Sequence, residues 1–351
     1  MEFALVSLGD HLADPNTGAW STQSEKYQLV VDHAIHGEAA GFTSIMLGEH
    51  HYCDYILSSP QVVLGAIAGR TTTLRLNTGV TLLPTLDPVR VAEDFTTLDV
   101  VSGGRAEVTV GRGILPSAYA AMEKPIDASR EIFAEYADLL LRLLRNDKVT
   151  WRGTWRSPLE DVSIEPRSVQ HPHLPVWIAG GSSAASVDLA AEVGARLMLP
   201  GVFAPAHFFG PFAARYRERF AAAGHPAAAM RIGNVFHTHV AATSQEARRR
   251  WEPYYRNYLS FVDAVWDGQA LFDGQVRPRQ SFDYDRLLAS TAICGSPAEV
   301  AERLIEAREL LGLDLIALSM DLGALPRDLL MESIDLVGSS VIPALRGDQS
   351  A

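Results

Sequence analysis

Residues 74–111, LRLNTGVTLLPTLDPVRVAEDFTTLDVVSGGRAEVTVG, contain the pattern that decides the fold. The apolar run at 74–82 predicts a strand. Asp87-Pro88 after it predicts the start of a helix, because aspartate caps a first turn and proline is tolerated at the first helical position. A second apolar run at 106–111 predicts the next strand. A strand, a helix and another strand in this order indicate a parallel βαβ unit.

The same alternation continues along the whole chain. Eight short apolar runs rich in β-branched residues predict strands at residues 2–7, 44–48, 74–82, 106–111, 175–179, 196–200, 232–241 and 314–319. Stretches with the apolar spacing of helices separate nearly all of them. This pattern favours an α/β fold of the (β/α)₈ TIM-barrel type, with residues 1–351 as one domain. An open, doubly wound sheet is the alternative.

Several helix ends are marked by capping residues. Thr22 and Glu25 have the spacing of a capping box, and Gly41 stands where a left-handed residue closes a helix. Ser296, followed by a proline, predicts a second capped start, and Gly312 predicts the corresponding end. These signals support the alternation of strands and helices.

Residues 261–292 interrupt this alternation between the seventh and eighth strands. They contain Gly268, Gly274 and Pro278 among aromatic residues, and show no clear periodicity. An insertion that follows a barrel strand lies on the C-terminal face, where lids over active sites form. A surface excursion whose aromatic side chains pack on the barrel is the alternative.

The composition limits the classes of function. Of the 351 residues, 47% are hydrophobic and 21% are charged, as in a soluble protein with a large core. The net charge of −12 argues against nucleic acids and anionic membranes as partners, because binding to phosphates needs a basic surface. Cys53 and Cys294 form no disulfide or zinc pattern, and neither a secretory signal nor a membrane-spanning run is visible. We therefore expect a cytoplasmic protein.

Glu49-His50-His51 follows the second predicted strand. Catalytic residues of a barrel come from the carboxyl ends of its strands, so this triplet marks the expected active site. The alternation of side chains along a strand allows one of the two histidines to face the mouth. A neutral imidazole can take up a proton near neutral pH, and we expect His50 to do so. A structural role for both histidines is the alternative.

Glycine-rich turns follow the third, fourth and fifth strands. Gly79 lies inside the third strand, where a glycine often marks a bulge or a closely approaching ligand. Gly111-Arg112-Gly113 offers an arginine to a phosphate. The glycines and serines at 180–186 predict a helix N-terminus that presents N–H groups and hydroxyls to an anion. Together these turns suit a flat ring with a phosphate tail, whereas ordinary turns and plain helix capping are the alternatives.

These stretches resemble the bacterial luciferase-like family of flavin-dependent monooxygenases. Gly48-Glu49-His50-His51 is similar to the Glu-His-His of that family at the end of strand two, and Gly111-Arg112-Gly113-Ile114 is similar to its strand-four motif. The likeness continues, in order, at residues 83–105, 175–179 and 294–300. It is specific to the family but not to one reaction within it.

The resemblance implies that FMN binds at the barrel mouth. His50 corresponds to the histidine that assists as a base in luciferase. The expected flavin contacts, in which the arginine and the serines would hold the phosphate, are Asn77, Gly79, Val80, Arg112, Ser182, Ser183 and Ser186. The family often has a non-prolyl cis peptide beneath the ring, at the position of Gly79-Val80. Luciferase has a reactive cysteine where this chain has Gly111, so a thiol effect on the flavin is not expected.

The reaction that this likeness implies is a two-component oxygenation. Reduced FMN, supplied by a transient partner reductase, would react with O₂ to a flavin C4a-(hydro)peroxide that oxygenates a small organic substrate. The residues expected to line an apolar substrate pocket are Leu8, Tyr52, Leu115, Tyr119 and Phe203. The family also suggests a homodimer packed through the helices that flank strands two and three, although the net charge is compatible with a soluble monomer.

Three other functions remain open from the sequence. A deazaflavin-dependent oxidoreductase of the same fold would transfer hydride without oxygen. A metal-dependent barrel hydrolase would use His50, Asp54, His237 and His239 as ligands, since residues two apart on a strand share one side. The third is a flavin-binding protein without turnover.

Overall fold

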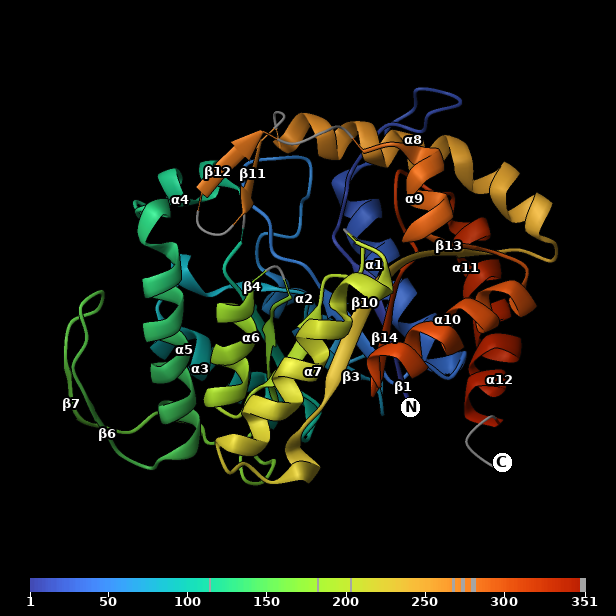
Figure 1. Ribbon diagram of the computed structural model, residues 1–351. Coiled ribbons are helices and arrows are strands. Elements are labelled where there is room, and N and C mark those ends of the chain that lie inside the picture. The colour runs from blue at the N-terminus through green and yellow to red at the C-terminus, as the bar shows by residue number, and fades with distance from the viewer. Residues whose placement is uncertain are drawn as a thin grey trace.

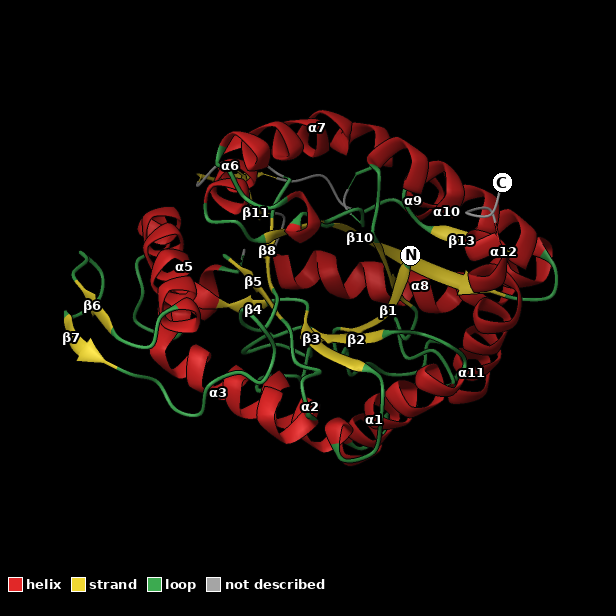
Figure 2. Ribbon diagram, turned by 90° about the horizontal axis from the view of Figure 1, so that it is seen from below, coloured by secondary structure: helices red, strands yellow, loops and turns green. Residues whose placement is uncertain are grey.

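The computed structural model describes residues 1–113, 115–181, 183–202, 204–266, 269–272, 275–278 and 282–347. Its central sheet is nearly closed into a barrel that helices surround (Figures 1 and 2). The strands are β1 (Glu2–Ser7), β2 (Ser44–Leu47), β3 (Arg75–Thr78), β4 (Thr81–Leu82), β5 (Val108–Gly111), β8 (Val176–Ala179), β9 (Arg196–Leu199), β10 (Ile232–Val240) and β14 (Leu315–Ser319). They follow the order β3, β2, β1, β14, β10, β9, β8, β5, β4, and all neighbours are parallel. The predicted barrel is thus confirmed, and the open sheet is wrong.

The third predicted strand is divided into β3 and β4. The break falls at Gly79 and Val80, whose peptide bond is cis, as the family likeness predicted. β3 closes the ring through a bridge between Leu76 and Ala106, and the Glu107 N–H donates to the Leu76 carbonyl at 2.8 Å. β4 pairs with β5 beyond the break. The two short strands therefore occupy one position in the barrel.

Helices cover the outside of the strands. Those packed around the barrel are α1 (Gln23–Ala39), α2 (Pro60–Ala68), α3 (Pro88–Ser102), α5 (Ser129–Arg145), α6 (Ala184–Glu192), α7 (Ala206–Ala222), α10 (Pro297–Leu311), α11 (Arg327–Leu336) and α12 (Ile342–Gly347). The capping box of Thr22 with Glu25 is present at α1, and Gly41 just beyond the helix has a φ of 94°. Ser296 caps α10, and Gly312 ends it in the left-handed conformation. The predicted helix ends are confirmed.

The segment between β10 and β14 contains more regular structure than its sequence indicates. Residues 261–266, expected in the insertion, continue α8 (Ser244–Trp266), because Tyr255, Tyr258 and Val262 are buried at helical spacing. An antiparallel hairpin follows, β11 (Gln269–Phe272) with β12 (Gln275–Pro278), and then α9 (Tyr284–Ser290). β13 (Ile293–Gly295) extends the sheet on β10. α8 lies across the carboxyl end of the barrel, and Figure 2 shows it through the ring of strands.

The remaining elements are short. α4 (Pro116–Ala121) follows β5, and a hairpin of β6 (Val149–Trp151) and β7 (Leu159–Val162) projects beside α5 (Figure 1). This hairpin was not predicted, because its strands are short and β7 has two exposed residues. Among the described residues, no helix is long and apolar enough to cross a membrane.

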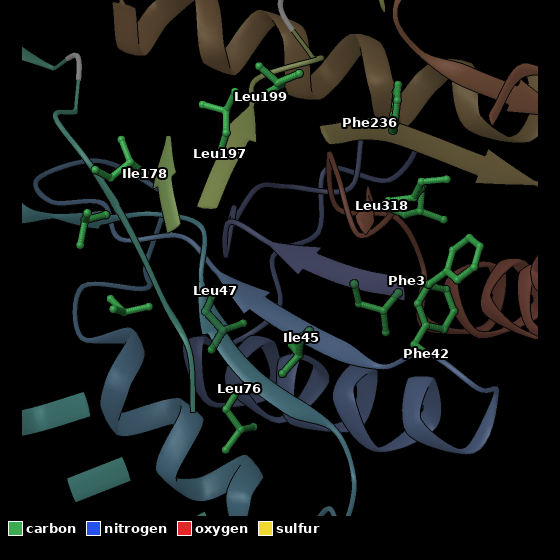
Figure 3. Packing of buried hydrophobic residues seen from close by; sticks show 14 of the residues in the cluster. Phe3, Phe42, Ile45, Leu47, Leu76, Ile178, Leu197, Leu199, Phe236 and Leu318 are labelled. Carbon is green, nitrogen blue, oxygen red and sulfur yellow. The ribbon is translucent and has the colours of Figure 1, made fainter. Parts of the chain in front are cut away.

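The core has an outer and an inner layer. Outward-facing residues such as Phe3, Ile45 and Leu47 pack between the strands and the helices (Figure 3). Inward-facing Ala4 and Val6 belong to a second, smaller cluster inside the barrel. This alternation decides which side chains can reach the mouth of the barrel.

Candidate active site

A cavity of about 560 Å³ lies at the carboxyl ends of the strands. Val6 and Met46 of the inner cluster line it from the barrel. Tyr258, Val262 and Trp266 line it from α8, which covers this end of the barrel (Figure 1). A cavity of this size is within the range of cofactor and ligand sites.

His50 lines this cavity as a neutral imidazole. Its ring stacks on Tyr55, with the ring centroids 4.1 Å apart and the planes at 25°. Burial lowers the pKa of His50 to about 4, and the neighbouring His51 contributes to the same shift. The ring nitrogen Nδ1 has no hydrogen-bond partner in the described part of the chain. Stacking therefore holds the ring in place, and its protonation depends on what occupies the cavity.

Glu49 is paired with His51, and not with His50. Oε1 of this buried carboxylate lies 2.9 Å from Nε2 of His51, and Oε2 accepts the Leu82 N–H at 3.1 Å. β2 ends at Leu47, so strand alternation does not extend to the triplet, and both histidines line the cavity. The expectation that only one of them faces the mouth is wrong for this reason.

Two arginines line the cavity on the side of β5. Arg112 follows β5, and its Nη1 donates to the Ser129 hydroxyl at 3.3 Å. Arg130 lies in the first turn of α5. Arg112 is expected from the sequence, whereas Arg130 is not, because no local motif indicates that this turn reaches the cavity. Two guanidinium groups at one cavity wall are suited to an anion such as a phosphate.

The start of α6 adds to this anion-binding side of the cavity. β8, the neighbour of β5, leads into the helix, and Ser183 is its N-cap residue. The Ser183 hydroxyl accepts the Ser186 N–H at 3.4 Å, and the Ser186 hydroxyl donates to the Ser183 carbonyl at 2.8 Å. Both serines line the cavity. The N–H groups and the dipole of a helix start attract anions. Ser182 lies outside the described residues.

Glycines form part of the cavity wall. A Cβ at Gly111 would lie 2.6 Å from Cγ2 of Val80, and Gly113 has a φ of 70°. Gly79 and Gly180 line the same cavity, as does Val80. Bare backbone of this kind allows a flat ligand to approach closely. The predicted contacts Gly79, Val80, Arg112, Ser183 and Ser186 are thus brought together around one cavity.

Asn77 is not brought to this cavity. Its side chain is fully buried, and its Oδ1 accepts the Thr109 hydroxyl at 3.0 Å in the barrel interior. Inward-facing residues of β3 lie below the mouth, and only the residues after the strand reach it. The structure therefore gives Asn77 a place in the polar interior, and does not support a direct flavin contact.

The predicted substrate residues divide in the same way. Leu8, Leu115 and Tyr119 line the cavity. Tyr52 does not, since its side chain is 66% exposed. Its φ of 60° lies in the left-handed region, which is uncommon for a residue with a side chain. Phe203 lies outside the described residues.

The ligands of the metal hypothesis do not meet. His237 lines the cavity, with its Nδ1 2.9 Å from the Tyr255 hydroxyl. His239 stacks on Trp251, and neither of its ring nitrogens has a partner among the described residues. Within this part of the chain, no group of three His, Cys, Asp or Glu side chains could hold a metal ion. The geometry does not support a metal hydrolase.

The sequence matches the family model of the luciferase-like monooxygenases over residues 1–314. The chain belongs to this family. The chain is 28% identical to the uncharacterized protein y4vJ of Sinorhizobium fredii, over 99% of this chain and 98% of the relative. It is 34% identical to the 4-hydroxyprotoasukamycin monooxygenase of Streptomyces nodosus, over 46% of this chain and 44% of the relative. It is 24% identical to the oxygenase component of the flavin-dependent trigonelline monooxygenase of Acinetobacter baylyi, over 51% and 49%.

Solved structures share the whole fold. Monooxygenase RslO1 from Streptomyces bottropensis has a TM-score of 0.86 and 26% identity, over 98% of this chain and 99% of that one. The oxygenating constituent of 3,6-diketocamphane monooxygenase from Pseudomonas putida, in complex with FMN, has a TM-score of 0.76 at 18% identity, over 98% of both chains. A coenzyme F420-dependent tetrahydromethanopterin reductase from Methanopyrus kandleri has a TM-score of 0.72 at 18% identity, over 98% and 99%. The last two comparisons show the fold alone.

Proposed function

We propose that this chain is the oxygenase of a two-component system that uses reduced FMN and O₂ to place one oxygen atom in a small organic substrate. One observation carries this proposal. A single cavity has arginines and a helix start on the side of β5 and β8, and the neutral imidazoles of His50 and His237 beneath the aromatic residues of α8. Such a cavity suits a ligand with an anionic tail and a reactive ring.

The residues present fit FMN by their chemistry. Arg112 and Arg130 would hold the phosphate, with Ser183 and Ser186 at the start of α6. The glycine-lined wall with Val80 would receive the flat ring. When bound in its reduced form, FMN supplies the activation of O₂ for transfer of one oxygen atom.

We assign His50 as the acid–base residue of this reaction. Without a ligand its pKa is about 4, so the ring is neutral at pH 7. A negative charge in the cavity would raise this pKa, because it favours the protonated imidazole. His50 could then take up and return a proton during turnover. The Glu49–His51 pair would hold a second imidazole fixed beside it.

α8 would exclude water from the reacting atoms. Tyr258, Val262 and Trp266 bring largely apolar surface to the cavity from above the barrel mouth. Exclusion of water protects a reactive oxygen species from wasteful decay. We propose that α8 is the cover of the site.

We propose a transient reductase and a second copy of the chain as partners, in the cytoplasm. A relative whose name includes "oxygenase component" supports a separate reductase. Val62 of α2 and Val101 of α3 are 70% and 68% exposed, and they give an apolar surface for a homodimer.

Val101→Glu is expected to convert the dimer to a monomer in sedimentation velocity, because it places a charge in that surface. A wild-type chain that sediments as a monomer would contradict the proposed dimer.

The decisive experiment follows the oxygen atom. The purified chain is mixed with FMN, a flavin reductase, NADH and ¹⁸O₂, and a panel of uncharged organic compounds is analysed by mass spectrometry. We expect one ¹⁸O atom per product molecule, and no product without the chain. A chain that binds neither oxidised nor reduced FMN would refute the proposal.

A deazaflavin-dependent oxidoreductase is the second candidate. The structural match to a coenzyme F420-dependent reductase shows that this fold accommodates that chemistry in another protein. Competitive titration separates the two functions. Tighter binding of coenzyme F420 than of FMN, with hydride transfer in the absence of O₂, would favour the second.

A further inference from the structure

His237 and Ser319 are neighbours at the cavity, although they are far apart in the sequence. They are paired in the register of β10 with β14, near the carboxyl ends of both strands. Both line the cavity, and their exposed fractions are only 6% and 1%. The Ser319 hydroxyl is buried and has no hydrogen-bond partner among the described residues. A buried hydroxyl without a partner is costly unless a ligand or water satisfies it.

One ring nitrogen of His237 has a hydrogen-bond partner. Its Nδ1 lies 2.9 Å from the Tyr255 hydroxyl, and Tyr255 is fully buried. Among the described residues, the Tyr255 hydroxyl has no other hydrogen-bond acceptor within reach. It therefore donates its hydrogen to Nδ1 of His237. The ring hydrogen then resides on Nε2. Burial lowers the pKa of His237 to about 3, which keeps the ring neutral, so Nε2–H acts as an uncharged donor.

The cavity lining on this side of the barrel is largely apolar and carries no charge. In the ring of strands, β14 stands opposite β5, which precedes Arg112. The side chains that β1, β10, β14, α8 and their ends bring to the cavity carry no formal charge at pH 7; they are Val6, Leu8, Val235, His237, Tyr258, Val262, Trp266 and Ser319. A charged substrate would lose its hydration here without gaining an ionic partner.

The aromatic contacts connect this pair with the predicted acid–base residue. The Tyr258 ring meets His237 edge to face, with the centroids 5.3 Å apart. The Tyr258 hydroxyl accepts the Tyr55 hydroxyl at 3.0 Å, and Tyr55 stacks on His50. His50 and His237 therefore belong to one aromatic wall of the cavity.

We propose that Nε2–H of His237 and the hydroxyl of Ser319 bind the oxygen atom of an uncharged, largely apolar carbonyl substrate. A carbonyl oxygen accepts two hydrogen bonds and donates none, which matches two donors side by side. This inference rests on the proposed function, since it assigns the substrate to the part of the cavity opposite the phosphate. His237 and Ser319 are thus specificity residues, and they select neutral ketones or aldehydes over acids and amines.

The test uses 2-acetonaphthone as a carbonyl probe and 2-isopropylnaphthalene as a hydrocarbon of similar shape. Each probe is titrated into the FMN-loaded protein, and the infrared carbonyl stretch of the bound ketone is measured. We expect a lower frequency than in hexane for the wild type. Ser319→Ala and His237→Phe should each return part of the shift and weaken the ketone roughly 3- to 10-fold, without the same loss for the hydrocarbon. Ser319→Ala removes one atom from a small side chain, which keeps the test valid if His237→Phe folds poorly.

Val235→Ala is the matched control, because Val235 lies on β10 two residues before His237 and lines the same cavity. It should weaken both probes equally and leave the carbonyl frequency unchanged. A frequency that is unchanged in FMN-loaded Ser319→Ala and His237→Phe would overturn this inference alone. A wild type that does not bind FMN would instead overturn the proposed function.

Discussion

At the scale of single residues, two adjacent histidines have different surroundings. His50 stacks on Tyr55, and burial disfavours its charged form. His51 is held by the buried carboxylate of Glu49. The first can therefore respond to a ligand, whereas the second is held in place by its hydrogen bond with Glu49. Their roles in turnover should differ accordingly.

Replacing His50 by alanine tests the acid–base assignment. We expect product formation to fall by roughly 100- to 10,000-fold, the usual contribution of a positioned proton-transfer group. FMN affinity should change little, because the phosphate side lies elsewhere in the cavity. Product analysis under excess reductase measures the rate of product formation, and fluorescence titration measures the affinity for FMN. His50→Gln, which keeps a polar side chain that does not titrate, should be as slow. Wild-type turnover in the glutamine variant would exclude proton transfer by this residue.

Arg112 and Arg130 should distinguish FMN from riboflavin. Loss of one charge-assisted contact costs about 1.5–3 kcal/mol, so Arg112→Ala is expected to weaken FMN by roughly 10- to 150-fold. Riboflavin lacks the phosphate, and its affinity should be almost unchanged. Arg90→Ala, on the exposed surface of α3, is the control and should affect neither ligand. Equal losses for FMN and riboflavin would show that Arg112 does not hold the phosphate.

At the scale of elements, the strands carry the site and α8 covers it. The polar groups follow the ends of β2, β5 and β8 or lie near the ends of β10 and β14, whereas the cover comes from a helix inserted after β10. Strand ends are held by the barrel, which favours accurate positioning. A cover supplied by an insertion can change without disturbing the barrel.

Trp266→Ala is expected to make the cover less effective. Removal of the indole opens a path for water, so more hydrogen peroxide should be released per NADH consumed, by several-fold, while FMN still binds. Peroxide detection beside product analysis measures this ratio. Arg256→Ala on the exposed face of α8 is the matched control. An unchanged ratio in Trp266→Ala would remove Trp266 from the cover.

At the scale of the whole molecule, burial of histidines makes stability depend on pH. Burial lowers the pKa values of His33, His50 and His239 to about 4 and that of His237 to about 3. These rings are neutral in the folded protein, whereas exposed histidines in the unfolded chain take up protons near pH 6.5. The unfolded state therefore binds more protons between pH 6.5 and 4, and the free energy of unfolding falls as the pH falls.

We expect several kcal/mol of stability to be lost between pH 7 and about 4.5, since each unit of pKa difference corresponds to about 1.4 kcal/mol. The pKa of Asp10 is raised in the folded protein, so this carboxyl takes up its proton in the folded state first and offsets the proton uptake of at most one histidine. Urea unfolding at a series of pH values measures the slope. His33 is buried at a place away from the cavity. His33→Phe should therefore reduce the number of protons taken up on unfolding in this pH range by about one. A free energy of unfolding that is constant over this range would contradict the buried neutral histidines.

The sequence by itself determined the barrel and much of the anion-binding side of the site. Apolar periodicity and helix caps are local properties, and they located eight strands within a few residues of those observed. The motifs around His50 and Arg112 were also visible, because each is a short run at a strand end. Asn77 shows the limit of this reasoning, since its strand was predicted and its position below the mouth was not.

Only the tertiary structure decided which of these residues meet. Arg130 reaches the cavity because α5 packs beside β5, and Glu49 pairs with His51 because the chain leaves β2 at Leu47. His237 meets Ser319 through the register of two strands that are distant in sequence. Register and helix packing arise from the closure of the whole barrel, in which every strand position depends on its neighbours. No local pattern of residues contains that information, and it is therefore the closed barrel that brings His237 and Ser319 together.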